Sequence, residues 1–132
     1  MRVKCVKLIN EITGKMEKTS PWLTIGKTYM VLEVIFSDYD GTLSYRLISD
    51  DAGSPVLNHA DLFEVVSGYI PSTWVVNAKA GRYFSMLPER WAQTGVLEAY
   101  FDAEPWAIAI YKEEVAKMQA EEEAHLAKIA TT

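Results

Sequence analysis

Residues 26–66 constrain the fold more than any other stretch, because their side chains alternate in the way that β-strands require. Side chains two positions apart lie on the same face of a strand, and aromatic and β-branched residues are frequent there. Within 28–36 one face is predicted to carry Met30, Leu32, Val34 and Phe36, and the other Tyr29, Val31, Glu33 and Ile35. A second alternating segment at 43–47 predicts the returning strand of a hairpin.

Short acidic turns separate these predicted strands. Asp38, Tyr39, Asp40 and Gly41 have the composition of a hairpin turn, since glycine accepts a positive φ and aspartate can bond to nearby backbone. Residues 50–55 predict a second break in the chain. The sequence therefore predicts a meander of antiparallel strands.

The order of predicted elements in residues 1–67 suggests a small barrel. A strand at 3–9 and a long polar loop at 10–21 precede the meander. A short strand at 56–57, one helical turn at 58–61 and a last strand at 63–66 complete it. This order and these loop lengths predict an SH3-like antiparallel β-barrel, in which closure removes exposed sheet edges.

The rest of the chain predicts a linker and hairpin at 68–87, followed by a helical part at 88–132. The hairpin has strands at 73–77 and 82–87 with a tight connection at 78–81, and two short helices follow at 88–93 and 96–101. Asp102 as a cap and Pro105 in the first turn predict one long helix, which runs to residue 128. Apolar positions thin out after residue 119, so we expect its last turns to project from the body.

Length and composition favour a single α+β domain over residues 1–132, with 49% hydrophobic residues to build a core. Four tryptophans are present, and we expect at least two of Trp22, Trp74, Trp91 and Trp106 to lie in the core rather than to stack on a ligand. No apolar run approaches the ~20 residues of a membrane-spanning helix. Cys5 has no partner for a disulfide, and lysines interrupt the first apolar segment, so we expect a cytoplasmic protein.

The sequence offers little for catalysis. A serine or cysteine nucleophile needs a base, and the only histidines are His59 in a predicted turn and His125 in the helical tail. An EF-hand beginning at Asp38 would need Gly and a carboxylate where Leu43 and Ser49 stand. We therefore expect no catalytic residues, no metal and no cofactor, and a protein that is not an enzyme.

The charge distribution suggests a protein partner. The net charge is −5; residues 1–30 carry six basic and two acidic side chains, whereas residues 31–70 carry seven acidic and one basic. Such an acidic meander disfavours direct nucleic-acid binding and suits a basic protein. Asp38, Asp40, Asp50 and Asp51 would steer that partner, and an exposed Tyr39 or Tyr45 would anchor it. The alternative is that these residues serve only turn formation and solubility.

Several segments carry a family resemblance that covers roughly residues 1–118: MRVKCVKLIN, PWLTIGKTYMVLEV, FEVVSGYIPSTWVV and ERWAQTGVLEAYFDAEPWAIAIYKEE. The chain resembles small bacterial immunity proteins of polymorphic-toxin and contact-dependent inhibition systems. The resemblance implies a cytoplasmic protein that sequesters a toxin domain without a cofactor, and it transfers no individual binding residue. The alternative is a structural or regulatory module of a prophage or other bacterial assembly, with a C-terminal helix that docks or self-associates.

Overall fold

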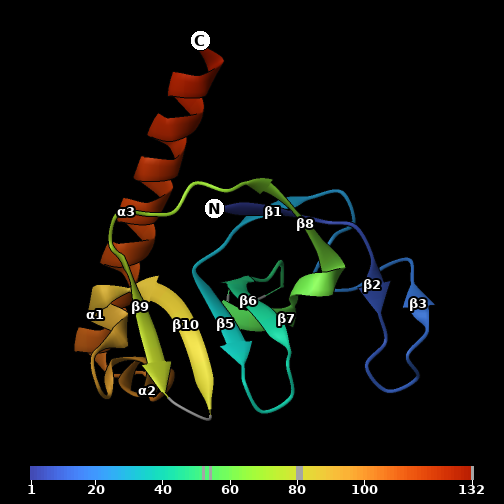
Figure 1. The fold of residues 1–132 in the computed structure, drawn as a ribbon, viewed down its shortest axis with the longest axis horizontal. Coiled ribbons are helices and arrows are strands. Elements are labelled where there is room, and N and C mark those ends of the chain that lie inside the picture. The colour runs from blue at the N-terminus through green and yellow to red at the C-terminus, as the bar shows by residue number, and fades with distance from the viewer. Residues whose placement is uncertain (52, 54, 80–81, 132) are drawn as a thin grey trace.

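The computed structural model describes residues 1–51, 53, 55–79 and 82–131, with only the backbone of residue 79. It is an α+β fold of antiparallel sheets with one long C-terminal helix (Figure 1). The strands are β1 (Arg2–Cys5), β2 (Leu8–Ile9), β3 (Met16–Glu17), β4 (Thr28–Met30), β5 (Glu33–Ser37), β6 (Leu43–Ile48), β7 (Pro55–His59), β8 (Phe63–Ser67), β9 (Trp74–Lys79) and β10 (Tyr83–Pro88). The helices are η1 (Ala60–Leu62), α1 (Glu89–Ala92), α2 (Val96–Phe101) and α3 (Pro105–Ala130).

The described strands pair as three separate sheets. A five-stranded sheet has the order β7-β6-β5-β10-β9, so the predicted hairpin β9–β10 extends the meander through β5. A three-stranded sheet has the order β4-β1-β8, and β2 pairs with β3 inside the predicted long loop. The helical turn predicted before the last strand of the meander is present as η1. The predicted turns at 50–55 and 78–81 include residues 52, 54, 80 and 81, which lie outside the described residues.

The strand predicted at 28–36 is broken at Val31 and Leu32, both fully buried. The Val31 N–H donates to the carbonyl of Met1, which precedes β1 of the three-stranded sheet. The Leu32 N–H donates instead to the carbonyl of Arg46, in β6 of the five-stranded sheet. The chain thus passes from one sheet to the other, and its alternation changes phase at this point. The prediction that Leu32 and Val34 share a face was wrong, because Leu32 packs under the helices and Val34 between the sheets.

The strand predicted at 3–9 is likewise interrupted. The N–H groups of Val6 and Lys7 both donate to the carbonyl of Leu62, which leaves them outside the ladder and divides β1 from β2. Cys5 is buried at the end of β1, as expected for an apolar strand position, and this burial raises the pKa of its thiol.

Two apolar clusters hold the fold together. The first lies between the three-stranded and the five-stranded sheet and includes Val3, Val34, Leu47 and Phe63. The second lies between the chain around Leu32 and the helices, and its buried members are Leu32, Leu87, Trp91, Val96, Tyr111 and Met118. Trp74 packs against both clusters and so links them. Trp91 is buried, whereas Trp22 and Trp106 are more than half exposed.

Helix α3 begins as predicted at Pro105, but Glu104 rather than Asp102 occupies the N-cap, without a side-chain cap bond. Its buried face includes two glutamates, Glu114 and Glu122. Glu122 accepts a hydrogen bond from the Met1 ammonium at 2.9 Å, and His125 stacks on Tyr69 at 4.3 Å. The prediction that the helix stops packing beyond residue 119 was therefore wrong for this part, and only its final turns extend past the sheets (Figure 1).

No helix within the described residues is both long and apolar enough to cross a membrane.

Candidate functional site

The acidic residues predicted to bind a partner lie at opposite ends of β6. Asp38, Tyr39 and Asp40 form the turn that enters this strand, and Asp50 and Asp51 follow its last residue. A strand of six residues separates the two groups by about 20 Å. The structure therefore does not gather the six predicted residues into one surface.

Tyr45 cannot serve as the exposed anchor that we predicted. Its side chain is only 6% exposed and its ring meets that of Phe63 edge-on, with the centroids 6.0 Å apart. Burial also raises the pKa of its hydroxyl. The correction follows from the phase of β6: Tyr45 pairs with Val34, whose side chain points between the sheets. Tyr39, by contrast, is 92% exposed.

Asp50 is engaged within the protein. Its carboxylate accepts hydrogen bonds from Lys27 Nζ at 2.5 Å, Thr24 Oγ1 at 2.8 Å and the Tyr29 hydroxyl at 2.9 Å. Partial burial would raise the pKa of Asp50, but these bonds and the lysine charge lower it overall. Asp51 accepts a bond from the Ser49 hydroxyl at 2.6 Å. These contacts tie the turn after β6 to the loop before β4, so they favour a structural role for Asp50.

The turn between β5 and β6 is held by internal hydrogen bonds and faces solvent. Asp40 accepts bonds from the Thr42 hydroxyl at 2.7 Å and the Thr42 N–H at 3.1 Å, and these bonds lower its pKa. Gly41 adopts a φ of 71°, the left-handed conformation that this turn requires. The Asp38 N–H donates to the Arg82 carbonyl at 3.0 Å, so this turn and the one before β10 lie side by side.

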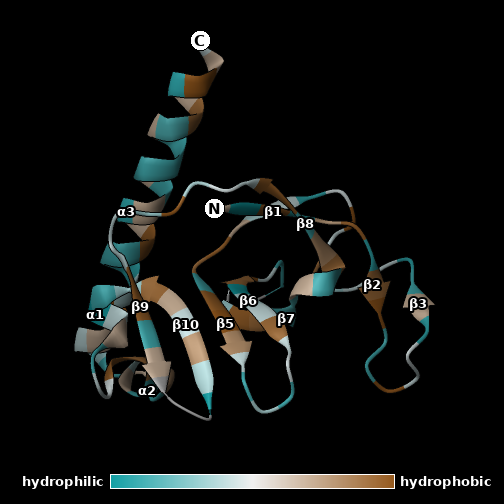
Figure 2. Ribbon diagram, viewed as in Figure 1, coloured by the Kyte–Doolittle hydropathy of each residue, from teal (hydrophilic) through white to brown (hydrophobic). Residues whose placement is uncertain are grey.

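An exposed apolar row adjoins these two turns. Cross-strand pairing places Leu43 beside Phe36, Phe36 beside Phe84, and Phe84 beside Ala78. The row thus crosses four strands on one face of the five-stranded sheet. Leu43, Phe36 and Phe84 are 40%, 39% and 43% exposed, and Val76 beside the row is 60% exposed. We call Phe36, Leu43, Val76, Ala78 and Phe84 the apolar ladder; Figure 2 shows its strands β5 and β10 as largely hydrophobic.

The apolar ladder is exposed because the three-stranded sheet covers only part of the five-stranded sheet. In the next row Val34 and Tyr45 are buried in the cluster between the sheets, and Met86 packs against it. Two residues further along each strand, towards the turns, the three-stranded sheet no longer covers the same face. Contiguous exposed apolar surface of this kind marks interaction sites more often than isolated apolar residues do.

Sequence reasoning missed the ladder. The alternation predicts strands with Phe36 and Leu43 on an apolar face, but it does not indicate that this face lies partly outside the core. Phe84 and Ala78 lie in the β9–β10 hairpin, and the pairing of β10 with β5 cannot be predicted from the residues of either strand alone. The one feature of the sequence that could have indicated the ladder is that β5 and β10 both have apolar residues close to their turns.

Two features of the described side chains bear on possible chemistry: the grouping of potential metal ligands and the buried Glu33. No group of three or more His, Cys, Asp or Glu among them could hold a metal ion. Glu33 is 3% exposed and receives a bond from Arg46 Nε at 2.7 Å; burial raises its pKa and Arg46 opposes that rise. Arg46 also donates to the Pro55 carbonyl and lies over the ring of Phe101. These contacts join the sheet to α2.

Comparisons of this chain with protein-family models, with curated proteins and with solved structures find no match.

Proposed function

We propose that this protein binds another protein through the apolar ladder, and that it neutralises a cognate toxin domain by direct sequestration. The observation that carries the binding role is the contiguous row from Leu43 to Ala78, flanked by the exposed Tyr39. Exposed aromatic side chains clustered on a rigid sheet are typical anchors of protein interfaces. The proposal that the partner is a toxin rests on the family resemblance. The proposals of a cytoplasmic location and of no catalytic activity rest on that resemblance and on the residue types in the sequence.

The charges beside the ladder indicate the chemistry of the partner. Asp38 and Asp40 are exposed at one end of the row, and Arg82 is exposed in the adjoining turn. Asp61 in η1 lies beyond β6, towards the Leu43 end of the row. The proposed partner therefore presents an apolar patch bordered by basic side chains. Asp50 and Asp51 are left out of this interface, since they lie at the other end of β6.

We also propose that the two larger sheets are the halves of an SH3-like barrel. The pairing of β1 with both β4 and β8 supports this arrangement, as does η1 between β7 and β8. The break at Val31 and Leu32 would then be the corner at which one strand serves both sheets. In this arrangement β9, β10 and the helices are additions to the barrel.

The test is a toxicity assay with a neighbouring toxin-like reading frame. Cells that express its lethal C-terminal domain should grow when this protein is co-expressed, and they should die when the co-expressed variant carries Phe36→Ser and Phe84→Ser. Losing two anchors of about 2 kcal/mol each would weaken binding roughly a thousandfold, and loss of one alone about 30-fold. The matched control is Val65→Ser with Val66→Ser on β8, where the exposures of 52% and 50% are similar. Equal protection by both double variants would contradict the assignment.

A second candidate, a structural or regulatory module, is favoured by the end of α3. This part of the helix extends past the sheets (Figure 1), with Leu126 and Ile129 37% and 54% exposed. Such a helix can dock in a groove or pair with a second copy. Self-association that is lost on Leu126→Lys with Ile129→Lys, in a chain that protects against no toxin, would favour this function over the first.

A further inference from the structure

The β2–β3 hairpin projects from the body of the protein, on the side away from β9 and β10 (Figure 1). Hydrogen bonds within the hairpin define its tip. The side-chain oxygen of Asn10 accepts from the N–H groups of Ile12 and Thr13 at 2.9 and 3.1 Å, and the Gly14 N–H donates to the Asn10 carbonyl at 2.7 Å. Ile12 is nevertheless 95% exposed, and Met16 on β3 is 70% exposed. Neither side chain belongs to the two apolar clusters, so both offer apolar surface to a second molecule.

Basic side chains flank this apolar surface. Three lysines within residues 7–18 form no ion pair in the part of the chain that the structure describes: Lys7, Lys15 and Lys18. The same segment has two acids, of which Glu17 accepts a bond from Asn10 Nδ2 at 2.9 Å and Glu11 lies in the tip. Three basic and two acidic side chains give the segment a net charge of +1, in a chain whose net charge is −5.

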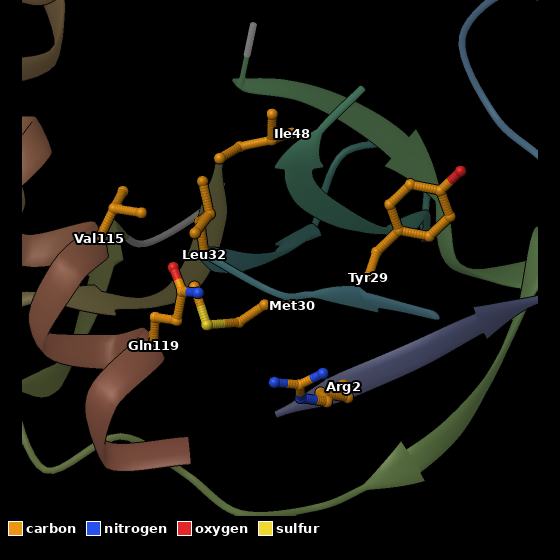
Figure 3. A pocket seen from close by; sticks show the side chains of 7 residues that line it. All are labelled: Arg2, Tyr29, Met30, Leu32, Ile48, Val115 and Gln119. Carbon is orange, nitrogen blue, oxygen red and sulfur yellow. The ribbon is translucent and has the colours of Figure 1, made fainter. Parts of the chain in front are cut away.

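Two other basic groups of residues 1–30 act inside the fold. Arg2 reaches from β1 towards α3 (Figure 3), where its Nε lies 3.8 Å from Oε1 of Glu122. Lys27 pairs with Asp50. These two cations therefore have carboxylate partners of their own, whereas the hairpin lysines remain for contacts with another molecule.

The apolar ladder has the complementary composition. Asp38 and Asp40 are exposed beside its Leu43 end, with Arg82 in the adjoining turn. The row crosses four strands, a width of about 14 Å, and a hairpin whose two strands are about 5 Å apart fits within it. Within one chain, β7 and η1 lie between the hairpin and the ladder strands β5 and β10 (Figure 1), so the hairpin does not cover its own ladder.

We propose that the β2–β3 hairpin of one copy docks on the apolar ladder of a second copy, with Ile12 against Phe36 and Phe84. The hairpin lysines then lie beside Asp38 and Asp40, so hydrophobic contact and charge act in the same direction. Because the two surfaces differ, the contact is heterologous, and copies join head to tail or close a ring. The inference rests on the ladder as a binding surface, as the proposed function does, but it needs no toxin.

Sedimentation velocity of the full chain, with no other protein present, measures this association. A contact of this size belongs to the weak class, so the chain is followed from about 10 μM to about 1 mM. The mean mass should rise above that of a monomer, and about 0.5 M salt should lower it, because salt screens the charges. Ile12→Asp should weaken the association about 30-fold. The matched control is Val65→Asp, at a position 52% exposed on β8, which should leave it unchanged.

Mixing two variants tests which surfaces meet. Ile12→Asp keeps the ladder, and Phe36→Ser with Phe84→Ser keeps the hairpin, so each protein alone should remain a monomer. An equimolar mixture should form a dimer and stop there, because each dimer uses the one intact hairpin and the one intact ladder. A monomeric unaltered chain at about 1 mM would overturn the proposal, as would a mixture without a dimer. Association that is lost only on Leu126→Lys with Ile129→Lys would also overturn it.

The result is separable from that of the toxicity assay. Ile12→Asp should lose self-association and still protect cells, whereas the ladder variant should lose both properties. Self-association that survives Ile12→Asp would overturn the hairpin contact alone. Protection that survives the ladder variant would overturn the proposed function alone.

Discussion

Replacing Arg46 by alanine is expected to lower the free energy of unfolding by about 3–5 kcal/mol, a large share of the stability of a domain this size. The reason is the partner left behind: Glu33 is 3% exposed and receives its bond from Arg46 Nε at 2.7 Å. Without the guanidinium its carboxylate would be buried and unpaired. Chemical denaturation of the two proteins at pH 7 measures the difference.

The loss of stability in Arg46→Ala should depend on pH, because the buried Glu33 carboxyl changes its charge with pH. Burial raises the pKa of Glu33, and in the variant nothing opposes this rise. An acid whose pKa is raised on folding contributes stability that is fully present below its unfolded value, about 4.3, and is lost as pH rises through the folded value. The deficit of Arg46→Ala should therefore shrink towards pH 4.

Two control variants distinguish the cost of leaving the Glu33 carboxylate buried and unpaired from the loss of the Glu33–Arg46 ion pair itself. The double variant Glu33→Leu with Arg46→Met should recover most of the stability, because apolar residues of similar volume commonly replace a buried ion pair without loss. Glu113→Ala, which breaks an exposed pair with Arg90 at 2.7 Å, should cost less than about 1 kcal/mol. A double variant as unstable as Arg46→Ala would show that Glu33 is not the source of the deficit.

Leu47→Ala and Met118→Ala should each cost about 2–5 kcal/mol, and both should lower one shared unfolding transition. Leu47 is 0% exposed in the cluster between the sheets, and Met118 is 1% exposed in the cluster beneath the helices. Trp74 touches both clusters and its Nε1–H donates to the Met118 sulfur at 3.1 Å. The two clusters should therefore unfold together, as one domain over the chain.

Denaturation followed by tryptophan fluorescence and by far-ultraviolet circular dichroism tests this account. The two signals should give one midpoint in each variant. Leu57→Ala, at a position 45% exposed, is the control and should cost less than about 1 kcal/mol. Two separate transitions, with Met118→Ala lowering the midpoint of only one and Leu47→Ala only that of the other, would show that the helical part is a domain of its own.

Local pattern predicted those elements whose sequence signal is complete within a few residues. The α+β class, η1, the hairpin β9–β10, α2 and the start of α3 at Pro105 were all predictable in this way. The break at Val31 and Leu32 was not, because both residues are apolar and both are fully buried. The chain passes from one apolar cluster to the other at these two residues, and an uninterrupted run of apolar residues does not reveal the change of phase.

The buried acids of α3 show a second limit. Glu114 and Glu122 occupy core positions that helical periodicity assigns to apolar residues. What makes Glu122 tolerable is the Met1 ammonium, more than a hundred positions away in the sequence. Such compensation depends on a tertiary contact that local sequence does not reveal. The sequence therefore predicted that the end of α3 projects from residue 119 onward, whereas in the structure the helix still packs at Glu122 and His125.

The candidate site was predicted only in part. The turn of Asp38, Tyr39 and Asp40 is exposed as expected, while Tyr45 is buried and Asp50 is bonded within the fold. Composition could show that acidic residues were concentrated in one stretch but could not show that β6 holds them apart. The apolar ladder depends on β10 pairing with β5, a contact between segments about 50 positions apart.

Amide hydrogen exchange of the protein, alone and mixed with a toxin domain that it is shown to neutralise, tests the proposed binding surface most directly. Formation of the complex should slow exchange at residues 36–43, 76–78 and 82–84, which carry the apolar ladder and the Asp38–Asp40 turn, and it should leave β8 and the end of α3 unchanged. Slowed exchange confined to the last turns of α3, with no change along the ladder, would contradict it.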